Sequence, residues 1–340
     1  MSENTTNSRR RFIKYSGAAV AVALAGCLGD EEGEYPEREI NTIVPWAEGG
    51  GTDRSMRHTS GPWSDTIGTE ITITNHPGAS TQIGGEELYG SDPDGYTIAM
   101  WNLPQMQATW LFQDAPYDMD SFDYIGTHHL DPTMWFAPDD VPYDDMAEFL
   151  DWAQDNHATI GTTAAIGNTA LSALLVNDTF DLDAEIVNLE GGTPTRQATL
   201  AGDVDAAVNQ PWAFNPDHQG EVTALGTHTP EPPDPDMWEG VSSFLELGLE
   251  EIPLVEEGFG QWKIIAAPGG LADEHPDRFE LLEETYLEAM ESDAYVESAR
   301  DDNRLDLITD AQGADACRQE VEDYTGFMED HGGLIDDFVA

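Results

Sequence analysis

Positive charge is the scarcest property of this sequence, whose 340 residues include 13 lysine and arginine side chains against 67 aspartate and glutamate side chains. Nucleic-acid binding is excluded, because phosphate contacts need clustered basic residues and no such cluster lies beyond residue 26. The net charge of −54 would destabilise a compact chain in dilute buffer. At molar salt the screening length falls to about 3 Å, so distant charges interact weakly. We therefore expect a halophilic protein, and its acidic surface says little about the charge of a small ligand.

Long apolar runs are missing as well. The run at residues 18–25 is too short for a membrane-spanning helix, which needs roughly 20 residues. It follows Ser-Arg-Arg-x-Phe-Ile-Lys at residues 8–14, which resembles a twin-arginine export signal, and it ends at Leu24-Ala25-Gly26-Cys27, which resembles a lipobox. These resemblances imply a signal peptide over residues 1–26, lipidation of Cys27 and an acidic tether over residues 27–36. The protein would then be extracytoplasmic, anchored by lipid on the outer face of the cytoplasmic membrane.

Cysteine is almost absent, which excludes a disulfide framework. Cys27 is assigned to the lipid, so Cys317 has no partner and is expected to pack as a small apolar group on a C-terminal helix. Apolar residues are not scarce, since they make up 39% of the chain and include nine tryptophans and twelve phenylalanines. This composition excludes an acidic disordered protein and supports a folded core.

Short apolar runs alternate with helical patterns along residues 37–340, a length that favours two domains. Strands are expected at 40–46, 70–75, 96–101, 159–162, 185–189 and 204–209, and helices from 52, at 144–156, from 168, at 194–201 and through the acidic tail from 273. The proline-rich segment 229–236 is expected to be a rigid loop. The alternation predicts an α/β fold of parallel sheets with helices on both faces.

A glycine-rich loop follows the first expected strand, in the order Val44-Pro45-Trp46-Ala47-Glu48-Gly49-Gly50-Gly51-Thr52-Asp53. Glycines let a backbone approach a ligand closely, and the free N–H groups at the start of the next helix favour an anion. No Gly-Lys-Ser/Thr follows, and Arg54 stands where a dinucleotide-binding loop needs its third glycine. The loop is therefore not a nucleotide site, and taken alone it is compatible with a plain turn.

Further motifs follow this loop: Asn75-His76-Pro77-Gly78-Ala79, Asp92-Pro93-Asp94-Gly95-Tyr96-Thr97, the segment 161–169, and Gly191-Gly192-Thr193-Pro194. Together with the loop, they resemble the receptors of the tripartite tricarboxylate transporter family, the Bug-type solute-binding proteins, over nearly the whole chain. The resemblance implies a two-lobed periplasmic-binding-protein fold of the second type, with two mostly parallel sheets joined by a two-strand hinge. Residues 37–130 plus 262–340 would form lobe 1, and residues 131–261 would form lobe 2.

The resemblance also implies which residues hold a ligand. The first loop would bind one carboxylate through backbone N–H groups, a loop of lobe 2 would bind the other, and a third contact would follow a later strand of that lobe. Such strand ends are where open α/β sheets bind ligands. The implied ligand-binding residues are Pro45, Trp46, Ala47, Glu48, Gly49, Gly50, Gly51, Thr52, Asp53, Thr162, Ala165, Gly167, Asn168, Thr169, Asn209 and Gln210.

Four positions depart from the family pattern. Trp46 replaces a phenylalanine and keeps an aromatic wall, Glu190 replaces a common lysine, and Asn209 stands where many relatives carry aspartate, so it tolerates an anion better. Glu48 stands where proline or alanine is common. It either points outward as one more surface charge or faces the cleft, where it would repel a carboxylate or pair with the ammonium group of an amino acid.

Other constellations favour structural interpretations. His128 and His129, with Asp131 nearby, suggest a metal pair, but adjacent residues on a strand face opposite ways, so we interpret them as part of a hinge strand. Arg196 follows Pro194 at a helix start, and it either reaches the cleft or, as we expect, pairs with surplus carboxylates. No nucleophile–base pair, zinc spacing or catalytic carboxylate pair is evident, so we expect no enzyme, no metal and no cofactor. The sequon at Asn177 lies within an expected helix, which argues against glycosylation.

The sequence thus predicts a monomeric extracytoplasmic receptor that captures a small di- or tricarboxylate between two lobes and delivers it to the permease subunits of a tripartite transporter. Three alternatives stay open: a receptor for an amino acid or aromatic acid, a sensor-coupled binding protein, and a secreted enzyme on a similar scaffold. The loops bind mainly through backbone groups and water, so their side chains record little about the ligand's identity.

Overall fold

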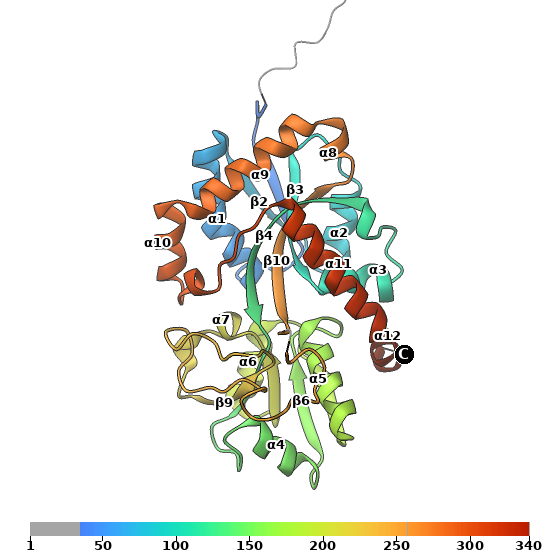
Figure 1. Ribbon diagram of the computed structural model, residues 1–340, viewed down its shortest axis with the longest axis vertical. Coiled ribbons are helices and arrows are strands. Elements are labelled where there is room, and N and C mark those ends of the chain that lie inside the picture. Colours follow the sequence, from blue (N-terminus) through green and yellow to red (C-terminus); the bar gives the residue numbers. More distant parts are fainter. Residues whose placement is uncertain (1–34, 257, 340) are drawn as a thin grey trace, which may run out of the picture. The chain divides into compact units, whose positions relative to one another are not determined.

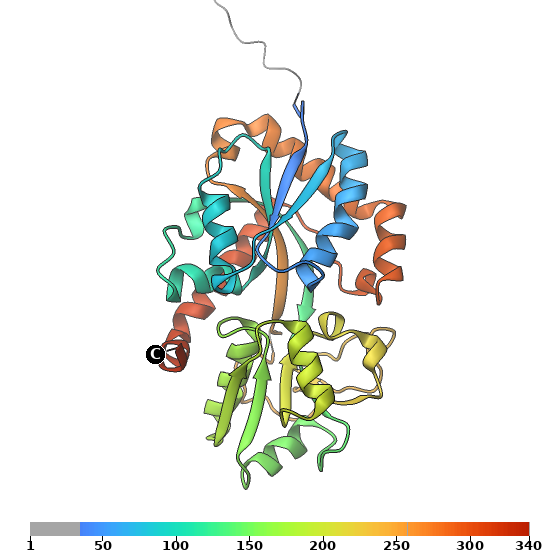
Figure 2. The same cartoon turned by 180° about the vertical axis from the view of Figure 1, so that it is seen from behind.

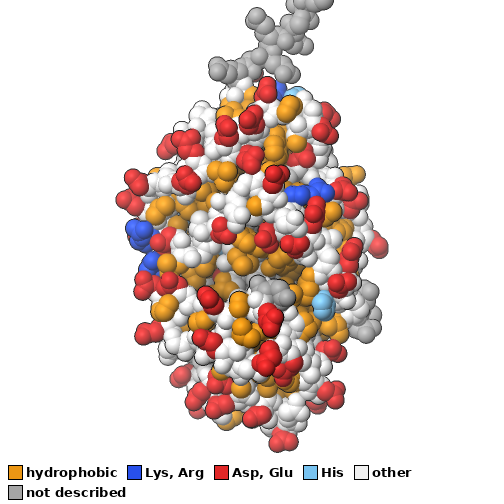
Figure 3. Space-filling model, in the orientation of Figure 1, with side chains coloured by type: hydrophobic (Ala, Val, Ile, Leu, Met, Phe, Trp, Pro, Cys, Tyr) orange, Lys and Arg blue, Asp and Glu red, His pale blue; other side chains and the backbone are white. Residues whose placement is uncertain are grey.

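The computed structural model describes residues 35–256 and 258–339 (Figure 1). The twin-arginine signal, the lipobox with Cys27 and most of the acidic tether lie outside these residues, so the inferences drawn from them stay predictions. None of the helices in the described ranges is both long enough and apolar enough to cross a membrane. On the face shown in Figure 3, acidic side chains are spread widely, whereas lysine and arginine appear in a few small groups.

Two five-stranded sheets organise the described residues. Sheet A has the order β2-β1-β3-β10-β4, and its strands are β1 (Ile40–Val44), β2 (Ile71–Asn75), β3 (Thr97–Leu103), β4 (Phe122–Pro132) and β10 (Gly260–Pro268). Sheet B has the order β7-β6-β8-β5-β9, and its strands are β5 (Met134–Pro138), β6 (Ala158–Thr162), β7 (Ala184–Asn188), β8 (Ala206–Asn209) and β9 (Val222–Thr227). One strand in each sheet, β10 or β5, runs against the other four. The predicted α/β fold with two mostly parallel sheets is confirmed.

Helices cover both faces of sheet A because its strands alternate between two apolar faces. In β3, Ile98 and Met100 belong to one core cluster, and Ala99 and Trp101 belong to another. The first face packs against α1 (Gly51–Ile67), α9 (Pro276–Glu291) and α10 (Asp293–Asp301), and the second against α2 (Gln82–Tyr89), α3 (Gln105–Phe112) and α11 (Ala314–Asp330) (Figures 1 and 2).

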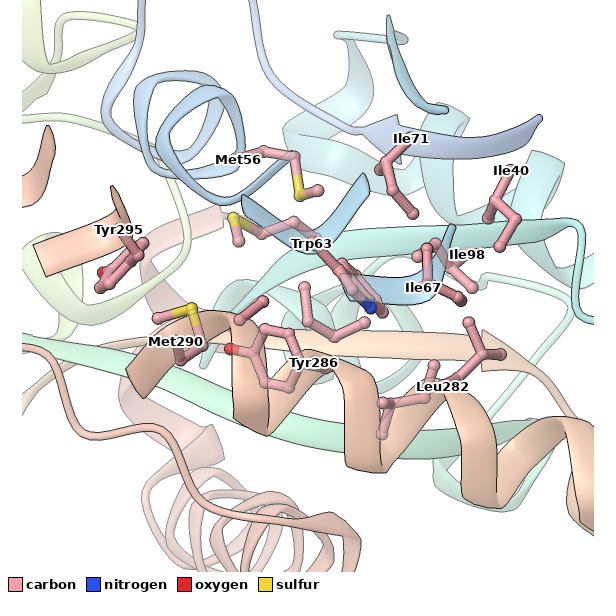
Figure 4. Packing of buried hydrophobic residues seen from close by; sticks show 14 of the residues in the cluster. Ile40, Met56, Trp63, Ile67, Ile71, Ile98, Leu282, Tyr286, Met290 and Tyr295 are labelled. Atoms are coloured by element: carbon pink, nitrogen blue, oxygen red, sulfur yellow. The ribbon is translucent and has the colours of Figure 1, made fainter. Parts of the chain in front are cut away.

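The contact between α1 and α9 shows how this core is built (Figure 4). The ring of Trp63 on α1 meets Tyr286 on α9 with ring centroids 5.1 Å apart, and both side chains are fully buried. The indole N–H of Trp63 donates to Thr285 Oγ1 at 3.1 Å, so the polar edge of the ring is satisfied inside the core. The α1 helix, whose first residues follow the glycine loop, is therefore fixed firmly on sheet A.

Sheet B is covered in the same way. One face, with Trp135 of β5, packs against α4 (Met146–Ala153) and α5 (Asn168–Phe180). The other face, with Phe136, meets α6 (Gly192–Ala201) and α7 (Pro211–Phe214), and the rings of Phe136 and Phe214 stack with centroids 4.0 Å apart. Successive side chains of β5 point to opposite faces of the sheet, as they do in β3, so this one strand contributes to the apolar core on both faces.

The chain passes between the two sheets twice. Only Thr133 separates β4 from β5, and the return runs from β9 through residues 228–259 to β10. Backbone hydrogen bonds tie the crossings together: the Thr133 N–H donates to Phe259 O (2.9 Å) and the His228 N–H donates to Thr133 O (2.9 Å). The two crossings agree with a two-strand hinge, while the exact lobe boundaries at 130/131 and 261/262 stay a prediction.

A β-bulge at His128 interrupts β4. Lys263 of β10 pairs with His129 and Ile264 pairs with Thr127, which leaves His128 as an extra residue. The bulge brings both imidazoles together, with their Nδ1 atoms 2.7 Å apart. The expectation that these two histidines face opposite ways was therefore wrong, although their position on a strand that leads between the sheets was correct.

Several local expectations are confirmed. Cys317 is a buried free cysteine on α11, Asn177 lies within α5, and residues 229–236 form neither helix nor strand. The tail after residue 270 is largely helical, with α8 (Leu271–Glu274), α9, α10, α11 and α12 (Gly332–Val339). The sequence analysis did not anticipate β5, β9, β10, α2, α3 or α7.

Candidate functional site

Asp53 shapes the loop between β1 and α1. Gly49 in this loop has φ +80°, and Gly50 precedes α1 without a side-chain cap. Asp53 Oδ2 accepts hydrogen bonds from the Gly49 N–H (2.8 Å) and Arg57 Nε (2.8 Å), and Oδ1 accepts one from Asn75 Nδ2 (3.0 Å). Burial alone raises the pKa of Asp53, but the hydrogen bonds from Arg57, Gly49 and Asn75 outweigh burial and lower the pKa. The ionised carboxylate therefore holds the loop in one shape.

Asn102 of β3 supports the same loop from the side of the sheet. Its Oδ1 accepts a hydrogen bond from Trp46 Nε1 (2.6 Å), and its Nδ2 donates to Thr52 Oγ1 (2.9 Å) and to Gln261 Oε1 (3.1 Å). Asn102 and Thr52 are buried, so these bonds form in a medium of low dielectric, where they are strong. The aromatic wall at Trp46 and the start of α1 are thus fixed relative to sheet A.

A cavity of about 670 Å³ lies between this loop and elements of sheet B. Small-molecule sites in proteins commonly measure roughly 300–1,000 Å³. One wall is formed by residues 46–52 and Arg54, and the facing wall is formed by the loop before α6, by α6 itself and by α7. The lining residues are Trp46, Ala47, Glu48, Gly49, Gly50, Gly51, Thr52, Arg54, Thr163, Glu190, Gly191, Gly192, Thr193, Pro194, Arg196, Gln210, Ala213, Asn215, Gln261, Asp302 and Asn303.

Two helix N-termini contribute to these walls. Gly50 and Gly51 lie at the start of α1, Gly191 and Gly192 lie at the start of α6, and neither helix has a side-chain cap. The N–H groups of a first helical turn have no acceptor within the helix, and the helix dipole adds partial positive charge there. Both walls therefore present backbone donors that suit the oxygens of an anion.

Gln210 adds a side-chain donor to the wall formed by sheet B. This residue follows β8, is 3% exposed and lines the cavity. Its Nε2 has no hydrogen-bond partner within the described part of the chain. Buried polar atoms are nearly always hydrogen-bonded in folded proteins, so an acceptor inside the cavity would complete this site.

The predicted ligand-binding residues divide into two groups. Those that line the cavity are Trp46, Ala47, Glu48, Gly49, Gly50, Gly51, Thr52 and Gln210. Those that do not line it are Pro45, Asp53, Thr162, Ala165, Gly167, Asn168, Thr169 and Asn209. For both groups, contact with a ligand stays a prediction.

Asn168 shows why some residues lie behind the wall. Its Oδ1 accepts a hydrogen bond from Gln105 Nε2 (3.0 Å), and its Nδ2 donates to Thr133 Oγ1 (2.9 Å). Gly167 beside it has φ +139°, and a side chain there would meet Gln105. The amide that we expected to face a ligand is thus engaged with α3 and with the crossing at Thr133.

Asn209 and Thr169 support residues that do line the cavity. Asn209 Oδ1 accepts a hydrogen bond from the Gln210 N–H (2.9 Å), and its Nδ2 donates to Gly192 O (3.1 Å). The hydroxyl of Thr169 lies 2.9 Å from the hydroxyl of Thr163. These side chains hold the sheet B wall in place from behind.

Glu48 lies at the rim of the cavity. Its side chain is 79% exposed, and Oε1 pairs with Arg57 Nη2 at 3.4 Å. Glu48 is therefore exposed to solvent and shares Arg57 with Asp53, which holds the same guanidinium more closely.

Arg54, Asp302 and Trp212 form an assembly that the sequence did not reveal, and Arg54 and Asp302 line the cavity. The Arg54 guanidinium forms an ion pair with Asp302 and lies 4.3 Å from the centre of the Trp212 ring, and Trp212 Nε1 donates to Asp302 O at 2.9 Å. Asp302 is distant from Arg54 in sequence, and no local motif marks it. In the sequence, the Gly-Gly-Thr-Pro motif at residues 191–194 and the predicted contact at Gln210 marked the facing wall.

Arg196 departs from expectation. Its Nη1 donates to Ala213 O (3.3 Å) and Phe214 O (3.0 Å), and within the described residues its guanidinium forms no ion pair with a carboxylate. The prediction that Arg196 pairs with surplus carboxylates was therefore wrong.

Metal ligation finds no support in the described ranges, where no group of three or more histidine, cysteine, aspartate or glutamate side chains is placed to hold an ion. The cavity offers backbone N–H groups, an amide and two guanidinium groups. Such donors bind an anion and do not by themselves provide a nucleophile and its base.

A model of the tripartite tricarboxylate transporter family receptors matches residues 56–324. Among curated proteins, protein BugT of Bordetella pertussis is 24% identical over 336 residues, which cover 93% of this chain and 96% of that protein. A UPF0065 protein of the same species is 27% identical over 158 residues, which cover 44% of this chain and 49% of that protein. That alignment thus spans about half the length of the relative.

Solved structures share the fold. A structure from R. palustris with adipate has a TM-score of 0.77 at 21% identity and covers 89% of this chain and 98% of its own. MatC from Rhodopseudomonas palustris, with bound malate, has a TM-score of 0.70 at 22% identity and covers 90% of this chain and 100% of its own. The TM-scores indicate a common two-lobed architecture, and at identities this low the ligand of the present chain stays open.

Proposed function

The chain belongs to the receptors of the tripartite tricarboxylate transporter family, and from this membership we propose that it captures a small di- or tricarboxylate outside the cell and delivers it to a transporter's permease. The family consists of solute-binding receptors and not of enzymes. Malate and adipate, the ligands in the two similar structures, are both dicarboxylates.

The unpartnered Nε2 of Gln210 is the observation that carries this proposal. It is a buried donor that belongs to a residue lining the cavity, and the two cavity walls also present uncapped helix starts, at Gly51 on α1 and at Gly192 on α6. A carboxylate on each wall would accept hydrogen bonds from these donors, and the helix dipoles would favour its charge. The donors belong to segments already held by Asp53, Asn102 and Asn209, so little ordering is needed on binding.

The rim charges favour an anion over an amino acid. Glu48 is the acidic side chain that we considered as a partner for an ammonium group, but it is exposed and paired with Arg57. Water therefore screens the charge of Glu48, and this side chain is poorly placed to hold the ammonium group of an amino acid.

The location of the receptor is part of the proposal. The twin-arginine and lipobox motifs support export and anchoring through Cys27 on the outer face of the membrane, and the acidic surface supports activity in brine. We propose that the receptor works as a monomer. Membrane fractionation of a Cys27→Ser chain tests the anchor, since recovery of that variant with the membranes would contradict it.

Calorimetry in molar salt tests the ligand. The panel contains citrate, malate, succinate, adipate, glutamate and an aromatic acid, titrated into the full chain. We expect at least one di- or tricarboxylate to bind, and Gln210→Ala to bind the same acid more weakly, by roughly 10-fold for a hydrogen bond to a charged group. A folded wild-type protein that gives no heat with any acid would refute the proposal.

A further inference from the structure

Arg196 stands out among the arginines of this acidic chain. Six others form an ion pair with at least one carboxylate: Arg38, Arg54, Arg57, Arg300, Arg304 and Arg318. Arg196, on α6, makes its hydrogen bonds to two backbone carbonyl groups, those of Ala213 and Phe214. In a chain with 67 acidic residues, a guanidinium without a carboxylate partner among the described residues requires an explanation.

The side chain of Arg196 is held in a way that leaves part of it available. Both of its hydrogen bonds use Nη1, which fixes the guanidinium on α7. Within residues 35–256 and 258–339, Nη2 and Nε have no hydrogen-bond acceptor. The residue is half-buried and lines the cavity. An arginine fork can bind the two oxygens of a carboxylate at once, so this guanidinium is preorganised for such a group.

The charges around Arg196 leave it uncompensated. Burial lowers the pKa of Arg196, and the positive charge of Arg54 lowers it further. Arg54 itself is paired with Asp302, and its guanidinium lies over the ring of Trp212 on α7. Glu190 also lines the wall of Arg196, but its side chain is exposed and forms no ion pair with Arg196. The sheet B wall thus carries a half-buried positive charge, whereas the charge on the sheet A wall is paired.

We infer that Arg196, together with Gln210, holds the second carboxylate of the ligand and makes the receptor select dianionic acids over monoanionic acids of the same length. This inference rests on the proposed function and adds a specificity-determining residue to it. One carboxylate meets only backbone donors at the start of α1, and the other meets the guanidinium and amide of the facing wall. A ligand without the second carboxylate binds more weakly, because the positive charge of Arg196 then has no anionic partner. A zwitterion also binds more weakly, because its ammonium group faces hydrogen-bond donors on one of the two walls.

A purely structural role is the competing explanation, because Arg196 also satisfies the carbonyl groups at the end of α7. The two roles differ in what they predict. A structural role lowers stability and weakens every ligand alike, whereas the specificity role changes the ratio between ligands. Arg196→Lys keeps the charge but loses the fork, and Arg196→Gln loses both.

Paired acids give the test. Calorimetry of the full chain in molar salt compares adipate with hexanoate and succinate with butyrate, for wild type, Arg196→Gln, Arg196→Lys and the matched control Arg300→Gln. Arg300 is an exposed arginine paired with Asp306, and it does not line the cavity. We expect Arg196→Gln to weaken binding of the preferred dicarboxylate by roughly 10- to 100-fold while hexanoate or butyrate changes less than threefold. Arg196→Lys should fall between, and Arg300→Gln should match wild type.

Two kinds of result would overturn the inference. If Arg196→Gln binds dicarboxylates as wild type does, or weakens both members of a pair equally together with a lower melting temperature, Arg196 is structural. If wild type prefers the monocarboxylate, the selectivity is wrong although the receptor function stands. If the folded wild-type protein gives no binding heat with any of the acids, both the proposed function and this inference are refuted.

Discussion

Asp53 lies in the first turn of α1 beside the cavity, Asp131 lies near the end of β4 where the chain crosses between the sheets, and neither side chain is accessible to solvent. Burial acts on both, yet the pKa of Asp53 lies below its ordinary value and the pKa of Asp131 is raised to about 6. Asp53 accepts hydrogen bonds from Arg57, Asn75 and the Gly49 N–H. At Asp131, which lies deeper in the protein, the effect of burial dominates, whereas at Asp53 the close hydrogen bonds outweigh it.

Asp131 belongs to what we call the crossing cluster, which consists of His128, His129, Asp131 and Lys263. The Lys263 Nζ lies 3.9 Å from Asp131 Oδ2, Asp131 Oδ1 accepts a 3.4 Å hydrogen bond from the Trp212 N–H, and the Ala213 N–H is a second backbone donor to this carboxylate. Lys263 Nζ, Asp131 Oδ2 and His129 Nε2 are buried without a hydrogen-bond partner in the described part of the chain. Burial lowers the pKa of Lys263 to about 8, despite the opposing effect of Asp131. The carboxylate of Asp53 is thus held by several close hydrogen bonds, whereas Asp131 and Lys263 attract each other mainly through their charges.

The largest expected effect comes from breaking the charge pair of the crossing cluster. Lys263→Met removes the cation and leaves Asp131 as a buried, uncompensated carboxylate, which should cost about 3–5 kcal/mol of unfolding free energy near pH 7. Denaturant unfolding in molar salt measures this. The control is Lys263→Met combined with Asp131→Asn, which should recover most of the loss. An equal loss in the double variant would show that the stem of Lys263, and not its charge, is what matters.

The second-largest effect is the pH dependence of the unfolding free energy, which should have opposite signs for Asp131 and Asp53. Because the folded-state pKa of Asp131 is raised from 3.8 to about 6, the folded protein binds that proton more tightly than the unfolded chain does. Its stabilising contribution is fully present below about pH 4 and is lost as the pH rises through about 6, by about 3 kcal/mol for a shift of two pKa units.

The comparison of wild type with Asp131→Asn isolates this contribution. Unfolding free energies of the two proteins, measured between pH 4 and 7 at constant molar salt, should diverge as the pH rises, with wild type losing more. Parallel curves would show that Asp131 keeps an ordinary pKa in the folded state.

A smaller effect is expected at Asp53. Asp53→Asn replaces one accepting oxygen with an amide N–H₂ that faces the donors of Arg57 and Asn75, so stability should fall by about 2 kcal/mol. The sign of the pH dependence is opposite to that of Asp131. The lowered pKa of Asp53 gives stability that is present above its unfolded value of 3.8 and is lost as the pH falls below it.

Asp65→Asn is the matched control for Asp53, since it lies on the exposed side of the same helix. It should leave stability within about 0.5 kcal/mol of wild type. If Asp53→Asn also stays within that limit while the loop binds acids normally, the loop does not depend on this carboxylate.

Short runs rich in apolar and β-branched residues predicted several strands. The strands β1, β2, β3, β6, β7 and β8 stood out in this way, and so did the helices that follow the glycine motifs. β10 was missed although all nine of its residues are buried, because Gln261 and Lys263 interrupt its apolar run. β4 is broken by the bulge at His128, which the period-2 argument could not foresee.

The candidate site divides in the same way. The loop at residues 46–52 and the glycines at 191–192 could be predicted, because glycine before a helix start is a local signal. Asp302 and Asn303 could not be, since they reach the cavity only through tertiary packing. The role of Asn168 depends on Gln105 and Thr133, which come from different elements. The local sequence therefore identifies loops whose backbone N–H groups can bind a ligand. Whether a side chain is free to bind the ligand depends on partners that are distant in the sequence.

The last helix of the chain has a mechanical consequence. α12 follows α11, which covers sheet A, yet Ile335 of α12 packs in one cluster with Leu171 and Leu175 of α5, which covers sheet B. Trp212 of α7 makes a second such bridge through its contacts with Arg54 and Asp302, and in Figure 1 the two bridges lie on opposite sides of β4 and β10. These two contacts join the sheets in addition to the two chain crossings. Opening of the cavity on the α7 side would require the Trp212 ring to part from the Arg54 guanidinium, so this arginine–aromatic contact would oppose that motion.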